Sequence, residues 1–314
     1  MNPKLKGTIC GIVAAISYGT NPLGAMNLYK DDISANTTIF YRFGLAALIL
    51  AAMMIVQRKS FAVTRRELLI LAVLGVLMGS SSSSLYFSFY FMDVGIASTL
   101  LFVYPVMVAV IMATLFKEKV TVSTVVSIAL SLAGITLLYH GGNGATLSTT
   151  GVLLVMVSSL TYAVYIVIVN KSSLRLSSVK LTFYVLVFGV LTILGYTAAM
   201  GQHIQMLTTP AQWGYAAMLA LVPTVISLVL MVIAVHDIGS TPTAIMGALE
   251  PLTAVAIGVM CFGEDFTARL ATGIVLILAA VILIIAGKSL SPHNITTVVN
   301  SIGHRLAKTW RWRQ

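Results

Sequence analysis

Long runs of hydrophobic residues, separated by short polar loops, account for most of this chain. Each run is long enough to cross a bilayer as a helix, because about 20 residues rising roughly 1.5 Å each span the hydrocarbon core. The pattern predicts ten membrane-spanning helices, at residues 7–26, 35–56, 68–91, 95–116, 121–140, 151–170, 178–200, 211–235, 240–262 and 268–286. The loops are too short to hold a soluble domain, so we expect an all-α membrane protein.

Composition and the placement of basic residues agree with this pattern. Of the 314 residues, 58% are hydrophobic and only 9% are charged, far less charge than soluble domains of this size carry. In this arrangement the Lys and Arg residues of the loops and ends fall on the side of the membrane that holds both termini, with two exceptions, Lys30 and Arg269. Arg42 lies inside a span. By the positive-inside rule we expect both termini in the cytoplasm and the chain in a bacterial cytoplasmic membrane.

One carboxyl group lies deep inside a predicted span. Of the nine acidic residues, only Glu250 falls near the middle of an apolar run. A carboxylate at mid-bilayer costs about 2.5–3.5 kcal/mol, and Pro251 beside it frees backbone carbonyls. Both features are tolerated where the helix faces protein or a water-filled cavity, which favours a functional role. The alternative is a neutral carboxyl that hydrogen-bonds to a neighbouring helix and holds the bundle together.

The chain repeats itself at a nearly constant spacing. The tripeptide at 93–95, Asp-Val-Gly, recurs as Asp-Ile-Gly at 237–239, and Pro105 recurs as Pro251. The repeat predicts two five-helix halves, 1–145 and 146–290, followed by a tail at 291–314. Because five is odd, the second half enters the membrane in the opposite orientation, an architecture typical of secondary transporters that bind substrate near the midplane.

Interrupted helices and polar stripes are expected where these halves meet. Prolines inside spans predict hinges at Pro105, Pro223 and Pro251. Helical spacing places several polar residues on shared faces, Glu250 among them. The residues that we expect to bind substrate are Ser17, Asn21, Ser83, Tyr86, Tyr90, Tyr104, Tyr162, Tyr165, Thr224, Ser227 and Glu250. Small residues such as serine and glycine also serve ordinary helix packing in lipid, so packing stays open for the serines.

Three segments carry a resemblance to a known family. They are the run 102–105 (Phe-Val-Tyr-Pro) leading to 117–119 (Lys-Glu-Lys), the run 249–251 (Leu-Glu-Pro) leading to Gly263-Glu264, and Arg42-Phe43 early in the second span. In combination they resemble the EamA-type branch of the drug/metabolite transporter superfamily, over residues 7–287. The resemblance implies a ten-helix bundle that exports amino acids or other small metabolites, with the first, third and fourth helices of each half around a central cavity. The serine run at 80–84 matches no motif of that family.

Arg42 lies about one and a half turns inside the second predicted span. Its long side chain can extend to the outer headgroups, which is the favoured interpretation. The alternative is a fixed positive charge that attracts anions at the outer mouth.

Other functional classes have little support in the sequence. A nucleotide-binding loop with Gly-Lys-Ser or Gly-Lys-Thr in Walker-type spacing does not occur, so energy would come from substrate or ion gradients. Glu250 can carry a proton or pair with a substrate amine, which leaves proton coupling open. An enzyme is not expected, because the sequence has no HExxH motif and one deep carboxylate rather than two. A lipid flippase or a packing subunit of a complex remains an alternative.

Cofactors, metals and nucleic acids are not expected as partners. Cys10 and Cys261 are too few and too far apart for a metal site or a disulfide framework. The net charge of +10 follows the topology and does not indicate nucleic acid. The basic stretch 295–314 is expected either to contact anionic lipid at the cytoplasmic face or to form a solvated, disordered tail. Oligomeric state cannot be predicted from the sequence, and the expected partners are a small-molecule substrate and membrane lipids.

Overall fold

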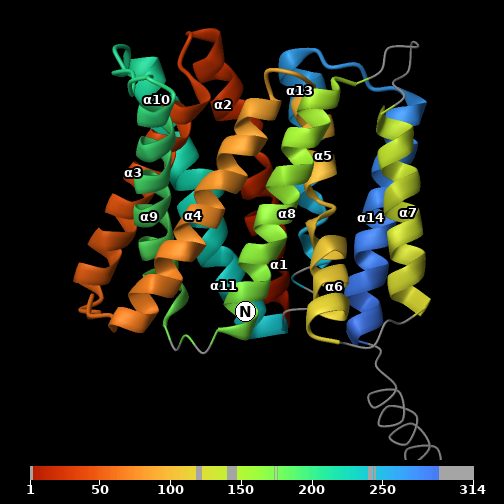
Figure 1. Ribbon diagram of the computed structural model, residues 1–314, viewed down its shortest axis with the longest axis horizontal. Helices are drawn as coiled ribbons and strands as arrows, with labels where there is room; N and C mark the ends of the chain where they lie inside the picture. Colours follow the sequence, from red (N-terminus) through yellow and green to blue (C-terminus); the bar gives the residue numbers. More distant parts are fainter. Residues whose placement is uncertain are drawn as a thin grey trace, which may run out of the picture.

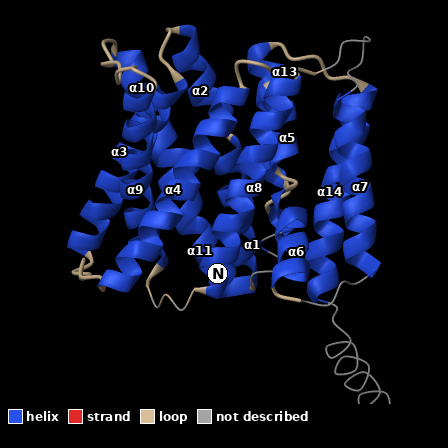
Figure 2. Ribbon diagram, in the orientation of Figure 1, coloured by secondary structure: helices blue, strands red, loops and turns tan. Residues whose placement is uncertain are grey.

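A computed structural model describes residues 3–117, 122–139, 147–172, 174, 176–239, 243 and 245–289. Within these ranges the regular elements are all helical (Figure 2). The helices are α1 Pro3–Gly19, α2 Asn21–Lys30, α3 Ala35–Val56, α4 Arg65–Ser88, α5 Val94–Leu101, α6 Tyr104–Leu115, α7 Val122–Tyr139, α8 Thr149–Lys171, α9 Ser178–Ala199, α10 Pro210–Ala220, the π-helix η1 Leu221–Ile226, α11 Ser227–Ile238, α13 Leu249–Phe262 and α14 Ala268–Ser289. The predicted tail and Glu118 lie outside the described residues.

The predicted spans are confirmed in number and place within the described part of the chain. Seven helical segments are long and apolar enough to cross a membrane, and three shorter apolar helices complete the ten. Helix ends use the capping that their sequence predicts. At the start of α4 the Thr64 side chain accepts the Glu67 N–H, and the Glu67 carboxylate accepts the Thr64 N–H at 2.7 Å. These caps satisfy backbone donors that a helix end leaves free.

Several spans are interrupted near their middle, close to prolines. The fourth span divides into α5 and α6 at Phe102–Val103, just before Pro105. In the eighth span Pro223 lies within the π-helix η1, and in the ninth a turn at Gly247–Ala248 precedes α13 and Pro251. The interruptions therefore occur where the prolines predict them, and motion about them stays a prediction.

A further interruption was not predicted. The first span divides at Thr20 into α1 and α2, and Pro22 follows as the second residue of α2. The Thr20 hydroxyl donates to the Ser17 carbonyl at 2.7 Å, so it satisfies one of the acceptors that the break leaves free.

The two halves pack against each other in a pattern that a twofold axis predicts. The first span (α1) packs against the eighth (α11), and correspondingly the sixth (α8) packs against the third (α4). Three further contacts join equivalent spans: α3 with α9, α5 with α13, and α7 with α14, the last pair at one edge of the bundle (Figure 1). This exchange of partners agrees with two inverted five-helix repeats.

Each half contributes glycines where helices approach closely. A Cβ added at Gly75 in α4 would overlap the Cβ of Phe188 in α9, and one at Gly7 in α1 would lie 2.7 Å from the Cβ of Asp237. Small residues at such positions allow backbones to approach, which in lipid replaces the hydrophobic driving force of soluble proteins.

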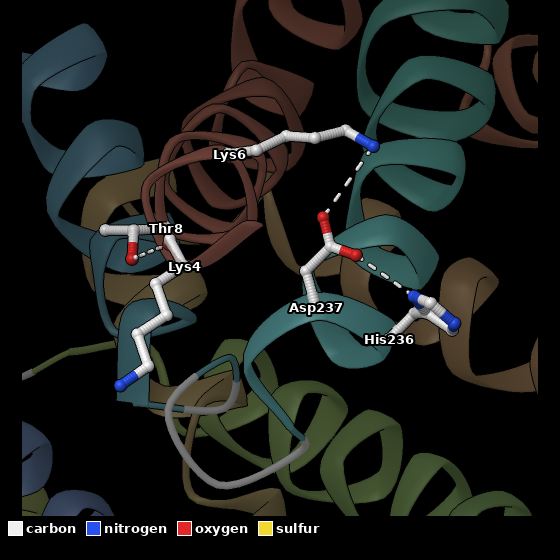
Figure 3. A network of polar contacts seen from close by, with 5 residues as sticks. All are labelled: Lys4, Lys6, Thr8, His236 and Asp237. Atoms are coloured by element: carbon white, nitrogen blue, oxygen red, sulfur yellow. Dashed lines mark hydrogen bonds and ion pairs between the residues drawn. The ribbon is translucent and has the colours of Figure 1, made fainter. Parts of the chain in front are cut away.

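A polar network ties α1 to α11 at the end of the bundle where α1 begins, which we call the basic end (Figure 3). Lys6 Nζ lies 3.7 Å from an Asp237 carboxylate oxygen, and His236 Nδ1 lies 3.0 Å from the other oxygen. On the same turn of α1 the Thr8 hydroxyl donates to the Lys4 carbonyl at 2.9 Å. We call the other end of the bundle, where α2 ends and α10 begins, the opposite end.

The glycine contacts yield a stability prediction. Gly75→Ala should lower the free energy of unfolding by about 1–3 kcal/mol, because the added methyl group must push α4 away from α9. Gly44→Ala is the matched control, since no atom lies within 4 Å of its added Cβ. Thermal unfolding in detergent measures both. Equal melting curves for the two variants would contradict the packing described.

Candidate functional site

Arg42 of α3 is the centre of a polar cluster inside the bundle. Its side chain is buried, with the residue only 5% exposed. Nε donates a hydrogen bond to the Thr224 hydroxyl at 3.0 Å, and Nη1 donates to the Tyr86 hydroxyl at 3.0 Å. The prediction that Arg42 extends to the outer headgroups is therefore wrong. The reason is that hydroxyl groups from α4 and η1 offer partners in the interior, which a view of α3 alone does not reveal.

The cluster continues from Arg42 into the broken first span. The Tyr86 hydroxyl donates in turn to Oδ1 of Asn21 at 3.2 Å, and Asn21 Nδ2 donates to the Tyr18 carbonyl at 2.8 Å. Asn21 is the first residue of α2, so the break at Thr20 places its side chain beside the hydrogen bonds of Arg42. Five helical elements, α1, α2, α3, α4 and η1, thus meet at one chain of hydrogen bonds.

Aromatic rings surround the guanidinium group. The Arg42 Cζ lies 5.9 Å from the ring centroid of Tyr18 and 5.7 Å from those of Phe43 and Tyr86. Distances within about 6 Å allow cation–π attraction, which partly offsets the loss of hydration around a buried charge. These rings stabilise the positive charge without neutralising it.

Three further tyrosines form what we call the tyrosine wall: Tyr104, Tyr162 and Tyr165. Tyr104 of α6 meets Tyr162 of α8 edge to face, with ring centroids 4.7 Å apart. Tyr162 stacks in turn on Tyr165, at 5.7 Å between centroids. Tyr104 and Tyr162 lie near enough to Tyr18 and Glu250 for electrostatic interaction with both. The structure thus brings the predicted tyrosines of α6 and α8 beside the predicted carboxyl.

Glu250 lies in the first turn of α13, directly after the turn at Gly247–Ala248. Its side chain is partly buried, and no hydrogen bond or ion pair joins its carboxyl group to any residue that the structure describes. Arg42 is near enough for its charge to act on Glu250, although the two do not form a direct ion pair. The described residues therefore give no support to a carboxyl that serves only to hold neighbouring helices together.

Some predicted site residues are occupied by contacts between helices. The Ser227 hydroxyl donates to the Ala14 carbonyl at 2.9 Å and so joins α11 to α1. Tyr90 is 49% exposed, stacks on Tyr29 with 4.7 Å between ring centroids, and its hydroxyl accepts the Ala35 N–H near the opposite end. A substrate contact at these two positions stays a prediction.

Serines of the third span divide between packing and the candidate site. Ser81 donates to the Ser158 carbonyl at 3.0 Å, and Ser80 lies 2.8 Å from the Tyr196 hydroxyl, so both join α4 to neighbouring helices. Ser83 and Ser17 are buried, and the Ser83 hydroxyl has no hydrogen-bond partner among the described residues. Ser83 shares a helical face with Tyr86, which places it next to the cluster.

Two residues of the site were not among those predicted to bind substrate, Tyr18 and Arg42. A signal for Tyr18 was present in the repeat, because Tyr18 in the first half corresponds to Tyr162 in the second. For Arg42 the sequence offered its place in the Arg42-Phe43 segment of the family resemblance and its depth along the span, and that depth suggested a residue near the membrane surface.

A second carboxylate joins the two halves near the opposite end. Glu264, in the loop between α13 and α14, accepts the backbone N–H groups of Val94 at 2.6 Å and Gly95 at 3.1 Å, at the start of α5. Burial raises the pKa of the Glu264 carboxyl to about 6, although the two N–H groups act to lower it. This contact holds α5 against the end of α13.

With the geometry in place, comparison with known proteins identifies the family. The model of the EamA-like transporter family matches residues 5–140 and again residues 149–286. This chain belongs to the EamA-like transporter family. The two matches correspond to the two five-helix halves and confirm the resemblance seen in the sequence.

Relatives and a solved structure agree with the assignment. An uncharacterized transporter of Archaeoglobus fulgidus is 28% identical over 272 residues, which cover 87% of this chain and 93% of the relative. Another, of Clostridium kluyveri, is 23% identical over 287 residues, which cover 88% of this chain and 92% of the relative. A crystal structure with 14% sequence identity superposes with a TM-score of 0.64 over 88% of this chain and 97% of its own, which shows the shared fold.

Membership of this family establishes a coarse function. The protein is an integral membrane protein of a transporter family, and its relatives are described as transporters rather than enzymes.

The Glu264 contact yields a pH-dependent prediction. Because the pKa in the folded protein lies above the ordinary 4.5, the contribution of Glu264 to stability is fully present below pH 4.5 and is lost as pH rises through about 6. Lowering the pH from 7 to 4.5 should therefore stabilise the wild type by about 1 kcal/mol relative to Glu264→Gln. This value is smaller than the full pKa shift would give, because the Glu264 carboxyl stays partly solvated.

Thermal unfolding in detergent at several pH values measures this difference. The amide that Glu264→Gln introduces cannot ionise, so the comparison cancels the contributions of other titrating groups such as Asp93. Parallel stability curves for the two proteins would show that Glu264 does not bind a proton more tightly in the folded state.

Proposed function

We propose that this protein is a secondary transporter that carries small metabolites, amino acids or related compounds above all, out of the cell by alternating access. The observation that carries the proposal is Glu250: a carboxyl inside a membrane span that has no hydrogen-bond partner among the described residues and lies near the buried Arg42. Ionisable groups in such positions are costly and typically belong to substrate or ion pathways.

The helix interruptions support the alternating motion. The breaks at Thr20, at Phe102–Val103 and at Gly247–Ala248 all adjoin residues of the cluster or of the tyrosine wall. Interrupted helices at a repeat interface let short segments move on either side of a fixed site. Pro105, Pro223 and Pro251 are the hinges in this account.

Glu250 supplies the coupling in the proposed mechanism. A desolvated carboxyl can bind a proton on one side of the membrane and release it when the site opens to the other side. The same group can instead pair with a substrate amine. If Glu250 carries a proton, its loss abolishes pH-driven transport while substrate binding can persist, whereas if it pairs with the substrate, its loss weakens binding. Both follow from its position beside Arg42 and the tyrosine wall.

The orientation and surroundings are part of the proposal. We infer that the basic end faces the cytoplasm of a bacterial cell, because basic residues concentrate there. The basic stretch 295–314, which lies outside the described residues, is proposed to contact anionic lipid at that face.

Lipid flipping is the alternative with a structural feature in its favour. A groove on the surface between α13 and α14 is lined by nine apolar residues, among them Leu252, Met260 and Phe266. Such a groove suits an acyl chain, but a flippase also needs a polar path for the headgroup. The described lining of this groove contains no polar side chain, so metabolite transport is better supported.

Glu250→Gln tests the proposed function. A thermal-shift screen of the wild type against amino acids, polyamines, sugars and nucleosides first identifies a solute that binds, because ligands raise the stability of the folded state. In proteoliposomes, a pH gradient should then drive transport of that solute by the wild type. Glu250→Gln should lose at least about tenfold of the pH-driven rate, since the amide cannot carry a proton.

Asp265→Asn is the control, because it removes an exposed carboxylate from a loop outside the site. It should transport as the wild type does. If the Glu250→Gln rate equals the wild-type rate at every pH, neither role of Glu250 survives. If no solute binds or moves, the transport function itself is wrong.

A further inference from the structure

We propose that Arg42 binds the carboxylate group of the transported solute, so that the substrates are small carboxylates and, preferably, amino acids whose amine lies toward Glu250. This assignment rests on the proposed transport function and adds the chemical group that the site recognises.

Arg42 carries a buried positive charge that no ion pair among the described residues balances. The guanidinium group is always protonated, and its residue is 5% exposed within a membrane span. Among the described residues, direct ion pairs join Lys6 and His236 to Asp237 at the basic end, and none involves Arg42. A buried cation with no counter-ion in direct contact is expensive, so a negatively charged ligand would gain strongly by binding beside it.

The Arg42 guanidinium has more hydrogen-bond donors than its neighbours in the cluster occupy. A guanidinium group carries five N–H groups in a rigid planar fork. Thr224 accepts from Nε and Tyr86 accepts from Nη1, and the Tyr18 hydroxyl lies close enough to interact with the group as well. All three partners are neutral hydroxyl groups, so they orient the fork and leave its charge in place. Two N–H groups remain beyond these three, and each can donate a charge-assisted hydrogen bond to a carboxylate oxygen.

Glu250 places a charge of opposite sign within electrostatic reach of Arg42. Glu250 interacts electrostatically with Arg42 but is not in contact with it, so one positive and one negative group are presented to the same region. A monoanionic carboxylate neutralises Arg42 one to one, and Glu250 repels it about half as strongly as it would repel a doubly charged phosphate at the same distance. A zwitterion satisfies both groups, with its carboxylate at Arg42 and its ammonium at Glu250.

The tyrosine wall indicates the rest of the solute. Tyr104 and Tyr162 lie within electrostatic reach of Glu250, and Tyr165 stacks on Tyr162, so the wall offers an aromatic surface that suits an apolar or aromatic side chain. This guides the choice of probes: compounds built on a phenyl or a branched aliphatic group.

The experiment uses two matched series of probes with the purified full-length protein. The first series is L-phenylalanine, 3-phenylpropionate, L-phenylalaninamide and 2-phenylethylamine, and the second is its leucine counterpart. Dissociation constants come from thermal shifts over a range of concentrations. The wild type should bind the free amino acid at least about tenfold more tightly than its amide, the difference expected for a charge-assisted hydrogen-bonded pair.

Variants separate recognition from a structural role of Arg42. Arg42→Gln should bind amide and acid equally, and Arg42→Lys should regain part of the preference, since it keeps the charge without the planar fork. A group with only a structural role would change stability and leave the ratio of the two dissociation constants unchanged. Arg66→Gln is the matched control, because Arg66 is exposed at the start of α4 and its loss should leave the preference as in the wild type.

The outcomes distinguish this proposal from the proposed function. Equal binding of acid and amide by the wild type, or an unchanged preference in Arg42→Gln, overturns the assignment of Arg42. The assignment of Arg42 is also overturned if no carboxylate in either series binds. If an amine, a sugar or a nucleoside nevertheless binds and is transported, the transport function stands. Failure of all solutes to bind or move would remove the transport function.

Discussion

The cost of placing charge inside a membrane is the constraint on which this structure depends. Arg42 and Glu250 both lie within helices that cross the bilayer, where an ionised group is stable only with polar neighbours, a counter-charge or water. Tyr86 and Thr224 hydrogen-bond the guanidinium, and aromatic rings face it. These contacts are neutral, so they hold the cation in position and leave its charge available.

The backbone adapts to the same constraint. Three spans are interrupted at the level of the cluster, and each interruption leaves backbone groups that only protein or water can satisfy. The inverted repeat favours this arrangement, because the two halves bring equivalent spans into contact. Thus α5 meets α13 and α3 meets α9. Broken helices and ionisable groups then occupy the same region, which is what a solute site within a membrane requires.

Much of the fold could be predicted from sequence, since apolar runs of bilayer length and alternating basic loops are local signals. Glu250 was equally visible, as a single acid inside an apolar run beside Pro251. Arg42 was misjudged because its partners come from distant segments, 44 and 182 residues away along the chain. Pro22 was overlooked although it breaks the first span, and nothing local shows that Ser227 donates its hydroxyl to Ala14.

Labelling with a hydrophilic, membrane-impermeant thiol reagent tests the central claim most directly, namely that Glu250 faces a water-accessible site within the bundle. In a protein with Cys10 and Cys261 replaced by alanine, a cysteine at position 250 should react with the reagent, and a bound solute should slow the reaction. A cysteine at the membrane-facing position of Leu48, which is 68% exposed, should stay unlabelled. The account would be contradicted if the cysteine at position 250 did not react with the hydrophilic reagent but did react with a lipid-soluble reagent, as the cysteine at position 48 should.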